Sequence, residues 1–209
     1  MIYVVCYVTG TYGSGLSHFV NCHEGFYSVV PGQPDEGVDS SGGAFEIDKD
    51  LNIYIKEKRI PINNLNVAVK TRAKDNPYIH TMIQNYQSYL ENKDIKLIII
   101  APTDEILENA KNRNIWPSEY KKHPSKWYRE YIKNIQSYKN IIKEVADTFS
   151  YGNEYFIVKM EDILRWTSMP SDEYPDSYLS LCKFLDTNPR PTFKIDLKRI
   201  FFRTLKKDF

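Results

Sequence analysis

Cysteine, long apolar runs and net charge are all scarce in this sequence. The three cysteines, Cys6, Cys22 and Cys182, are widely separated and form no C-x-x-C pair. The sequence therefore predicts neither a zinc site nor a thioredoxin-like redox motif. A sparse, odd number of cysteines suits a reducing compartment, so we expect a cytoplasmic protein.

The apolar run at the start, residues 1–8, is short, has no basic segment before it and leads into glycines, so we expect no signal peptide. No run approaches the roughly 18 apolar residues of a membrane-spanning helix. The formal net charge is +1, which excludes a global basic field, and we expect no nucleic-acid partner. A chain of 209 residues is most simply one domain with a sizeable core.

Aromatic residues are abundant instead, at 14% of the chain, and 16 of them are tyrosines. Tyrosine tolerates half-burial, because its ring is apolar and its hydroxyl is polar. One interpretation is the packing of amphipathic helices. The other is a binding surface that stacks on rings or sugars.

Short apolar runs alternate with amphipathic segments along the chain. We predict strands at 2–8, 65–70, 95–100 and 155–160, a hairpin within 51–62, and helices at 16–23, 76–92, 102–114, 125–149 and 176–185. A turn-rich segment at about 31–50 is predicted to be a mobile loop, and the chain ends in a basic, aromatic tail at about 190–209. This alternation predicts an α/β fold, a three-layer α/β/α domain with a mainly parallel sheet.

The stretch YVTGTYGSGLSHF follows the first strand and resembles a Walker A loop without its lysine, since Leu16 stands at the lysine position. A loop between a strand and a helix offers backbone N–H groups to an anion, and glycines let it approach closely. The candidate cofactor-binding residues are Gly10, Thr11, Tyr12, Gly13, Ser14, Gly15, Leu16 and Ser17. Without the lysine we expect anion binding but no ATP hydrolysis. The alternative is a glycine turn that binds nothing.

The same stretch resembles the loop of sulfotransferases, which commonly reads T-Y-P-K-S-G-T-T and holds the 5′-phosphosulfate of PAPS (3′-phosphoadenosine 5′-phosphosulfate). Here GTYGSGLS matches at Ser14, Gly15 and the hydroxyl of Ser17. Many members carry K-T-H after the second strand, where this chain has Lys70, Thr71 and Arg72.

Two later segments extend the resemblance. The family's R-x-P with a following acidic residue is matched at Pro102 and Asp104 within KLIIIAPTDEIL. Its closing Y-E-D-L and F-L-G segments are similar to YFIVKMEDIL and YLSLCKFLDTNPRP. The order and spacing cover roughly 2–185, and the resemblance implies a P-loop NTPase-like topology with PAPS as the cofactor.

Three of the family's charged or basic groups are replaced here. Gly13 stands where the loop has a basic residue, and Arg72 stands where K-T-H has its histidine base. Ile100 or Ala101 takes the place of the arginine that holds the 3′-phosphate of PAPS.

Several residues outside the loop are candidates for chemistry. Lys70 and Arg72 follow a predicted strand and would supply the cationic charge that the loop lacks, or form a solvated pair. His80 is the candidate general base, or a packing histidine. His18 and His23 are five residues apart and are poor metal partners, so we expect no metal site.

Three further polar features are open to simpler interpretations. Glu161 and Asp162 are expected to cap the helix that follows them, rather than to act as an acid pair. Thr103 is predicted to cap the helix at 102–114. The basic tail is either a solvated face or a contact for an acidic ligand or partner.

These observations lead to a first hypothesis, an enzyme that transfers a sulfuryl group from PAPS to a hydroxyl of a small molecule or glycan. Lys70, Arg72 and His80 are its catalytic candidates. The alternatives are a non-catalytic anion- or nucleotide-binding module of P-loop fold, and a degenerate kinase-like P-loop protein.

Overall fold

The computed structural model describes residues 1–8, 11–26, 45–47, 53–55, 67–72, 95–112, 124–170 and 173–205. Its strands are β1 (Ile2–Tyr7), β2 (Phe45–Ile47), β3 (Ile53–Ile55), β4 (Val67–Arg72), β5 (Ile95–Ile100) and β6 (Tyr155–Val158). Its helices are α1 (Gly13–Asn21), α4 (Asp104–Asn112), α6 (Pro124–Thr148), α7 (Met160–Trp166), α8 (Asp176–Leu185) and α9 (Phe193–Leu205).

Four strands form a parallel sheet in the order β4-β1-β5-β6, so the first strand lies inside the sheet. β5 reads IKLIII and is buried almost throughout, as a parallel strand covered on both faces should be. The α/β prediction with a parallel sheet is confirmed.

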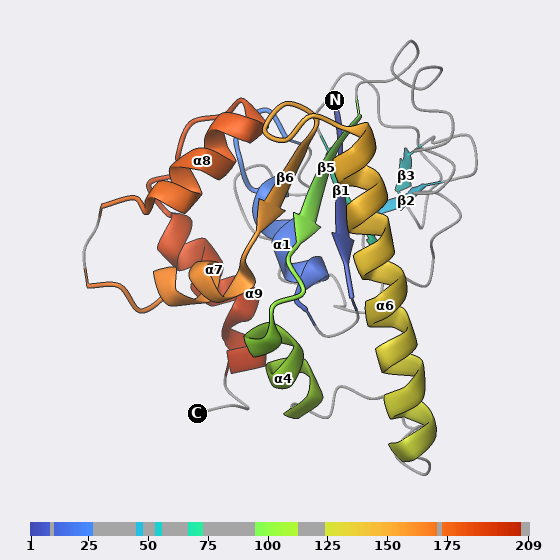
Figure 1. The fold of residues 1–209 in the computed structure, drawn as a ribbon. Coiled ribbons are helices and arrows are strands. Elements are labelled where there is room, and N and C mark those ends of the chain that lie inside the picture. Colours follow the sequence, from blue (N-terminus) through green and yellow to red (C-terminus); the bar gives the residue numbers. More distant parts are fainter. Residues whose placement is uncertain are drawn as a thin grey trace.

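Helices cover both faces of this sheet (Figure 1). Tyr3, Val5 and Tyr7 of β1 belong to a core cluster with residues of α1, α7, α8 and α9. The carbonyl of Cys6 instead accepts a hydrogen bond from Tyr138 of α6, which places α6 on the other face. Successive side chains of a strand point to opposite faces of the sheet, so the short strand β1 contributes to the packing on both faces.

Several element boundaries differ from the sequence prediction. The predicted strand at 95–100 and helix at 176–185 match β5 and α8 residue for residue. The hairpin predicted within 51–62 is instead β2 paired antiparallel with β3, and β2 lies inside the segment predicted to be a mobile loop. The tail is not an irregular segment, because it holds α9. The helix predicted at 76–92 lies outside the described residues.

Among the described residues, three tyrosines are fully buried, and each has a hydrogen-bonded hydroxyl. Tyr3 donates to the carbonyl of Leu185 at 3.1 Å, Tyr138 contacts strand carbonyls, and Tyr178 is bonded to a histidine. For these three residues the packing interpretation of the aromatic content is confirmed.

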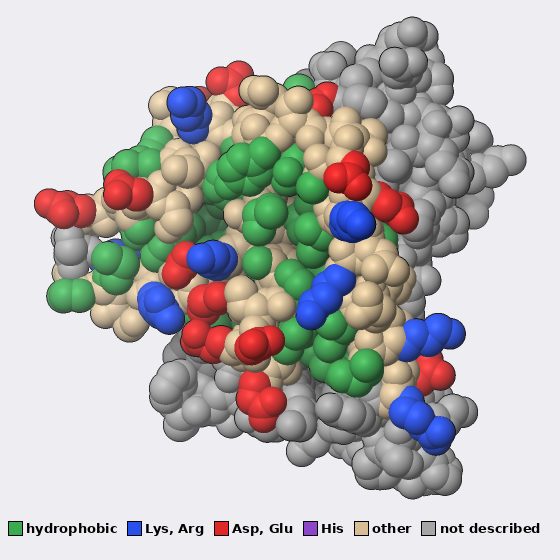
Figure 2. All heavy atoms as spheres, viewed as in Figure 1, with side chains coloured by type: hydrophobic (Ala, Val, Ile, Leu, Met, Phe, Trp, Pro, Cys, Tyr) green, Lys and Arg blue, Asp and Glu red, His purple; other side chains and the backbone are tan. Residues whose placement is uncertain are grey.

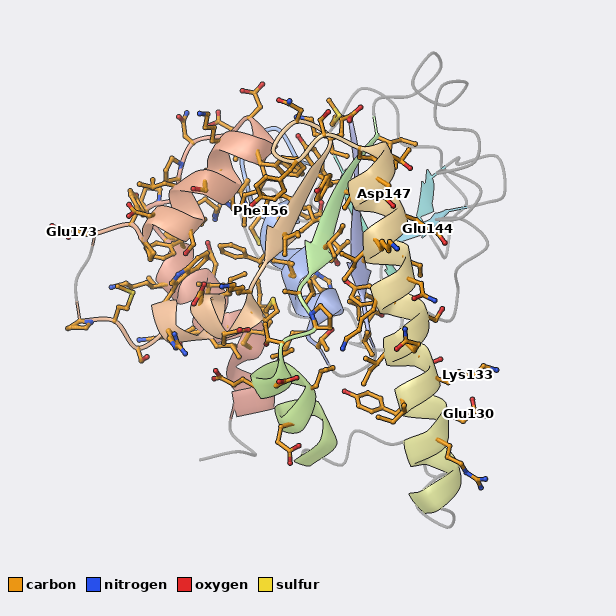
Figure 3. The ribbon with its side chains drawn as sticks, in the orientation of Figure 1. Glu130, Lys133, Glu144, Asp147, Phe156 and Glu173 are labelled. Atoms are coloured by element: carbon orange, nitrogen blue, oxygen red, sulfur yellow. The ribbon has the colours of Figure 1, made fainter. Side chains whose placement is uncertain are left out.

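The outer face of α6 is charged. Glu130, Lys133, Glu144 and Asp147 project from it away from the sheet (Figure 3). Among the described helices, none is long and apolar enough to cross a membrane.

Candidate functional site

The carboxyl ends of the parallel strands β1 and β5 lie side by side at the point where the strand order of the sheet reverses. The chain leaves β1 for β4 on one side and later returns to β5 on the other side. In open α/β sheets, ligands bind in the crevice at such a switch point. The first turns of α1 and α4 lie at this same end of the sheet (Figure 1).

A tight turn joins β1 to α1. The amide of Thr11 donates to the carbonyl of Val8 at 3.1 Å, and the Thr11 hydroxyl donates to the same oxygen at 2.7 Å. Tyr12 follows with φ 64° and ψ 19°, in the left-handed region. The amide of Leu16 then donates to the Tyr12 carbonyl at 3.0 Å, which closes the first helical turn. The helix therefore begins at Gly13, and the prediction that it begins at Leu16, directly after the glycine loop, is wrong.

This geometry decides which backbone groups face the end of the sheet. The amides of Gly13, Ser14 and Gly15 precede the first hydrogen bond of the helical ladder. Leu16 and Ser17 lie within the ladder, and the Leu16 side chain is fully buried in the core. The anion site thus narrows to three amides, and Gly10 lies outside the described residues.

Two of the glycines are explained by close packing. A Cβ atom on Gly13 would lie 2.2 Å from Cγ of Tyr7, and a Cβ on Gly15 would lie 2.3 Å from Cε1 of Phe201. Tyr12 also meets Phe201, in an edge-to-face contact with 5.7 Å between ring centroids. These positions therefore exclude a side chain whether or not an anion binds nearby.

Strand pairing places the two residues predicted to be cationic ligands on β4, next to β1. Lys70 is in register with Val5, and Arg72 is in register with Tyr7, the last residue of β1. Parallel neighbours are about 4.8 Å apart, so both positions adjoin the strand that leads into α1. The predicted base, His80, lies outside the described residues.

Tyr138 of α6 fills one side of the switch point. Its hydroxyl oxygen lies 2.7 Å from the carbonyl oxygen of Cys6 and 2.8 Å from that of Ile100. Pairing of β1 with β5 ends at Cys6 and Ile99, so the hydroxyl sits where the two strands part. Burial raises the pKa of Tyr138 well above its usual value, so the hydroxyl keeps its proton and donates. The α6 side of the switch point is therefore filled by a protein side chain.

Acidic groups mark the opposite end of the site, over α4 and α7 (Figure 2). Arg165 lies 3.5 Å from Glu105 and 3.7 Å from Asp162. The Thr103 hydroxyl accepts the amide of Ile106 at 3.4 Å, which confirms that residue as the cap of α4. These acidic side chains disfavour an anion beside α4.

The capping role predicted for Glu161 and Asp162 is wrong in its detail. The N-cap of α7 is Lys159, and no side chain there makes a capping hydrogen bond. Both acids lie in the first turn, where the helix dipole stabilises a carboxylate. Among the described residues, Oε2 of Glu161 is a buried oxygen without a hydrogen-bond partner.

His23 and the cysteines do not form a catalytic pair. Burial lowers the pKa of His23 to about 4, and burial raises the pKa of Cys182 to about 11. The two side chains lie 3.9 Å apart, but an activated cysteine needs a lowered pKa. Within the described part of the chain, no group of three or more acidic, histidine or cysteine side chains is arranged to hold a metal ion.

Sequence reasoning missed Tyr138 and Phe201. Each lies on the apolar stripe of an amphipathic helix, and that periodicity marks a residue as buried without saying what it contacts. The apolar spacing of Phe193, Leu197 and Phe201 was the available signal for α9.

Comparison with known proteins gives no further assignment. No protein-family model matches the chain, and neither a curated protein nor a solved structure is significantly similar to it.

Proposed function

We propose that the chain binds the phosphate or phosphosulfate group of a nucleotide at the first turn of α1. The observation that carries this proposal is the register of β4 on β1, in which Arg72 pairs with Tyr7 and Lys70 with Val5. It puts two cationic residues on the strand beside the turn that leads to the helix N-terminus.

The chemistry of these groups suits an oxyanion. Three backbone amides and the positive end of the α1 dipole favour negative charge, with the dipole worth about 0.3–1 kcal/mol at an exposed site. Arginine adds a bidentate fork that matches phosphate or sulfate. The first turns of α4 and α7 are acidic, so negative charge lies on the side of the site opposite the cationic residues of β4.

The resemblance to sulfotransferases supports PAPS as the nucleotide. In that reaction an acceptor hydroxyl oxygen forms a bond to sulfur while the bond from sulfur to the bridging phosphate oxygen breaks. The acceptor proton passes to a base, for which His80 is the candidate, and Arg72 and Lys70 neutralise the charge on the departing nucleotide. The acceptor would be a small molecule or glycan.

A non-catalytic anion-binding module is the second candidate. It is favoured by the packing of Gly13 and Gly15, which gives these glycines a role without any reaction. It also needs no base. A kinase-like activity is disfavoured, because the position of the Walker lysine is occupied by the fully buried Leu16.

A thermal-shift panel of PAPS, PAP (adenosine 3′,5′-bisphosphate), ATP, GTP and sulfate tests the proposal. A ligand that binds only the native state raises the unfolding midpoint in proportion to the logarithm of concentration over Kd. We expect shifts with PAP and PAPS that disappear in Arg72→Ala. Lys133→Ala, which removes an exposed charge on the outer face of α6, is the matched control. A shift only with Mg·ATP would promote the kinase reading, and no shift with any ligand would reject the site.

A measurement of turnover distinguishes the enzyme from the non-catalytic module. Transfer of a sulfuryl group to a hydroxyl acceptor, detected as PAP release, supports the enzyme. If Arg72 stands in for a lost base, Arg72→His should create or raise that turnover. Binding of PAP without turnover in either form supports the non-catalytic module.

A further inference from the structure

A chain of hydrogen bonds joins the end of α1 to α8. His23 is 2% exposed. Its Nδ1 lies 3.1 Å from the carbonyl oxygens of Phe19 and Val20, and its Nε2 lies 3.0 Å from the hydroxyl of Tyr178. The same hydroxyl accepts the backbone N–H of Arg190 at 3.0 Å.

Arg190 carries the connection on to α9. Its Nε donates to Oδ2 of Asp196 at 2.8 Å, and another guanidinium nitrogen donates to the carbonyl of Cys22 at the end of α1. Asp196 is 3% exposed and also accepts the hydroxyl of Thr192 at 2.9 Å. One network therefore ties α1, α8 and α9 together through side chains far apart in the sequence.

The partners of His23 require its neutral form. Two carbonyl oxygens can only accept, so Nδ1 carries the hydrogen, and the bare Nε2 accepts from the Tyr178 hydroxyl. A protonated ring would turn Nε2 into a donor that faces the same hydroxyl. The Tyr178 hydrogen would then lose this acceptor and keep only the weaker Cys182 sulfur, which also hydrogen-bonds with the Tyr178 hydroxyl.

The charges around His23 also oppose protonation on balance. The titratable groups that face it are Cys22 beside it, Tyr178 and Cys182 from α8, Arg190, and Asp196 from α9. Burial is the largest cause that lowers the pKa of His23 to about 4, and Arg190 acts in the same direction, while the Val20 and Phe19 carbonyls and Asp196 oppose the shift.

The other end of α9 covers the first turn of α1. Phe201 is 1% exposed and lies against Gly15, and its ring meets that of Tyr12. The segment 176–205 thus contacts both ends of α1. The His23 network reaches the last residues of α1, and Phe201 reaches the first turn of α1.

We propose that the segment 176–205 is an acid-sensitive clasp on α1, in which protonation of His23 breaks its hydrogen bond with Tyr178 and releases α8 and α9 before the sheet unfolds. The clasp requires no ligand and does not depend on the anion site proposed above, although Phe201 of the clasp packs against Gly15 in that site.

The three cysteines provide a test within one molecule. Cys22 and Cys182 lie at the clasp, and Cys6 lies in β1; each is at most 3% exposed. The full-length protein is labelled with 4,4′-dithiodipyridine, which reacts with thiols at acid pH, and each cysteine is quantified by peptide mass spectrometry. The ratio of Cys182 to Cys6 labelling cancels the intrinsic pH dependence of the reagent.

The ratio should exceed one at both pH 7 and pH 5, because the clasp opens while Cys6 stays covered by the sheet. Lowering the pH from 7 to 5 should raise the labelling of Cys182, relative to the urea-unfolded protein at the same pH, roughly 20-fold, as expected for a group whose pKa is about 4 when closed and 6.5 when open. Cys22 should follow Cys182. His23→Gln keeps an acceptor for Tyr178 but cannot titrate, and its Cys182 labelling relative to the unfolded protein should stay flat over this range.

The wild-type measurement decides the proposal even if His23→Gln fails to fold. A ratio close to one at both pH values would show that all three cysteines become reactive together by global unfolding, which would overturn the clasp. Labelling that does not change between pH 7 and 5 would overturn it as well. A folded His23→Gln variant with the wild-type pH dependence would assign the effect to another group.

Discussion

Single atoms at the carboxyl end of β1 decide what can occupy the site. A Cβ at Gly15 would overlap the ring of Phe201, and the Tyr138 hydroxyl holds the carbonyls of Cys6 and Ile100 where the strands part. Neither requirement is visible in the sequence, because both arise from residues more than 30 positions away. The glycine pattern predicted an anion site, and the packing of Gly13 and Gly15 is a second reason for glycine at these positions.

Gly15→Ala should destabilise the protein although alanine is the better helix former. Overpacking a buried site costs about 1–3 kcal/mol, which exceeds the gain in helix propensity of at most about 1 kcal/mol. Urea unfolding followed by circular dichroism measures the difference. Ser180→Ala, at an exposed position of α8, is the control and should change the free energy of unfolding by less than about 0.5 kcal/mol.

The contact itself can be isolated with a second substitution. Phe201→Leu shortens the opposing side chain, so Gly15→Ala should cost less in that background than in the wild type. Strictly additive effects would show that Phe201 is not what excludes the Cβ.

Tyr138→Phe should destabilise the protein by about 1–3 kcal/mol, because two buried carbonyls lose their shared donor. Tyr151→Phe removes a hydroxyl from a side chain that is 59% exposed and should have little effect. The same unfolding experiment compares them, and equal effects at the two positions would refute the role given to the Tyr138 hydroxyl.

Among the elements, β5 and α8 were predicted residue for residue, whereas α1 and α9 were not. A continuous apolar run or a regular amphipathic period is a local signal, and it is strong in β5 and α8. The start of α1 depends on a left-handed Tyr12, a conformation that a sequence pattern does not specify for tyrosine. The basic residues of α9 masked its apolar stripe.

The junction of α1 with α8 should make stability depend on pH. Between pH 6.5 and 4 the unfolded chain binds a proton at His23 that the folded chain excludes, so the free energy of unfolding rises with pH in this window. From pH 7 to pH 5 the loss should be about 2 kcal/mol. Urea unfolding at both values measures it, with His23→Gln as the control. Equal pH dependence in the two proteins would mean that His23 is not the group responsible.

At the scale of the whole molecule, the order of the parallel strands gives the position of the candidate site. The charged residues give the side of it on which an anion is proposed to bind. The prediction of an α/β fold with a parallel sheet is confirmed. It was possible because the alternation of apolar runs with amphipathic segments can be recognised in the sequence without knowing which residues are in contact. The placement of Arg72 beside Tyr7 follows from the register, which sequence alone does not give. The reaction stays a proposal, since it depends on a base and an acceptor that no described residue identifies.

Isothermal titration of PAP at pH 7 into the wild type, Arg72→Ala and Lys133→Ala tests the anion site most directly. A charge-assisted hydrogen bond is worth about 1.5–3 kcal/mol, so we expect Arg72→Ala to raise the Kd roughly 10- to 150-fold. Lys133→Ala should bind as the wild type does. Equal affinity of wild type and Arg72→Ala, or no binding of PAP by the wild type, would contradict the account.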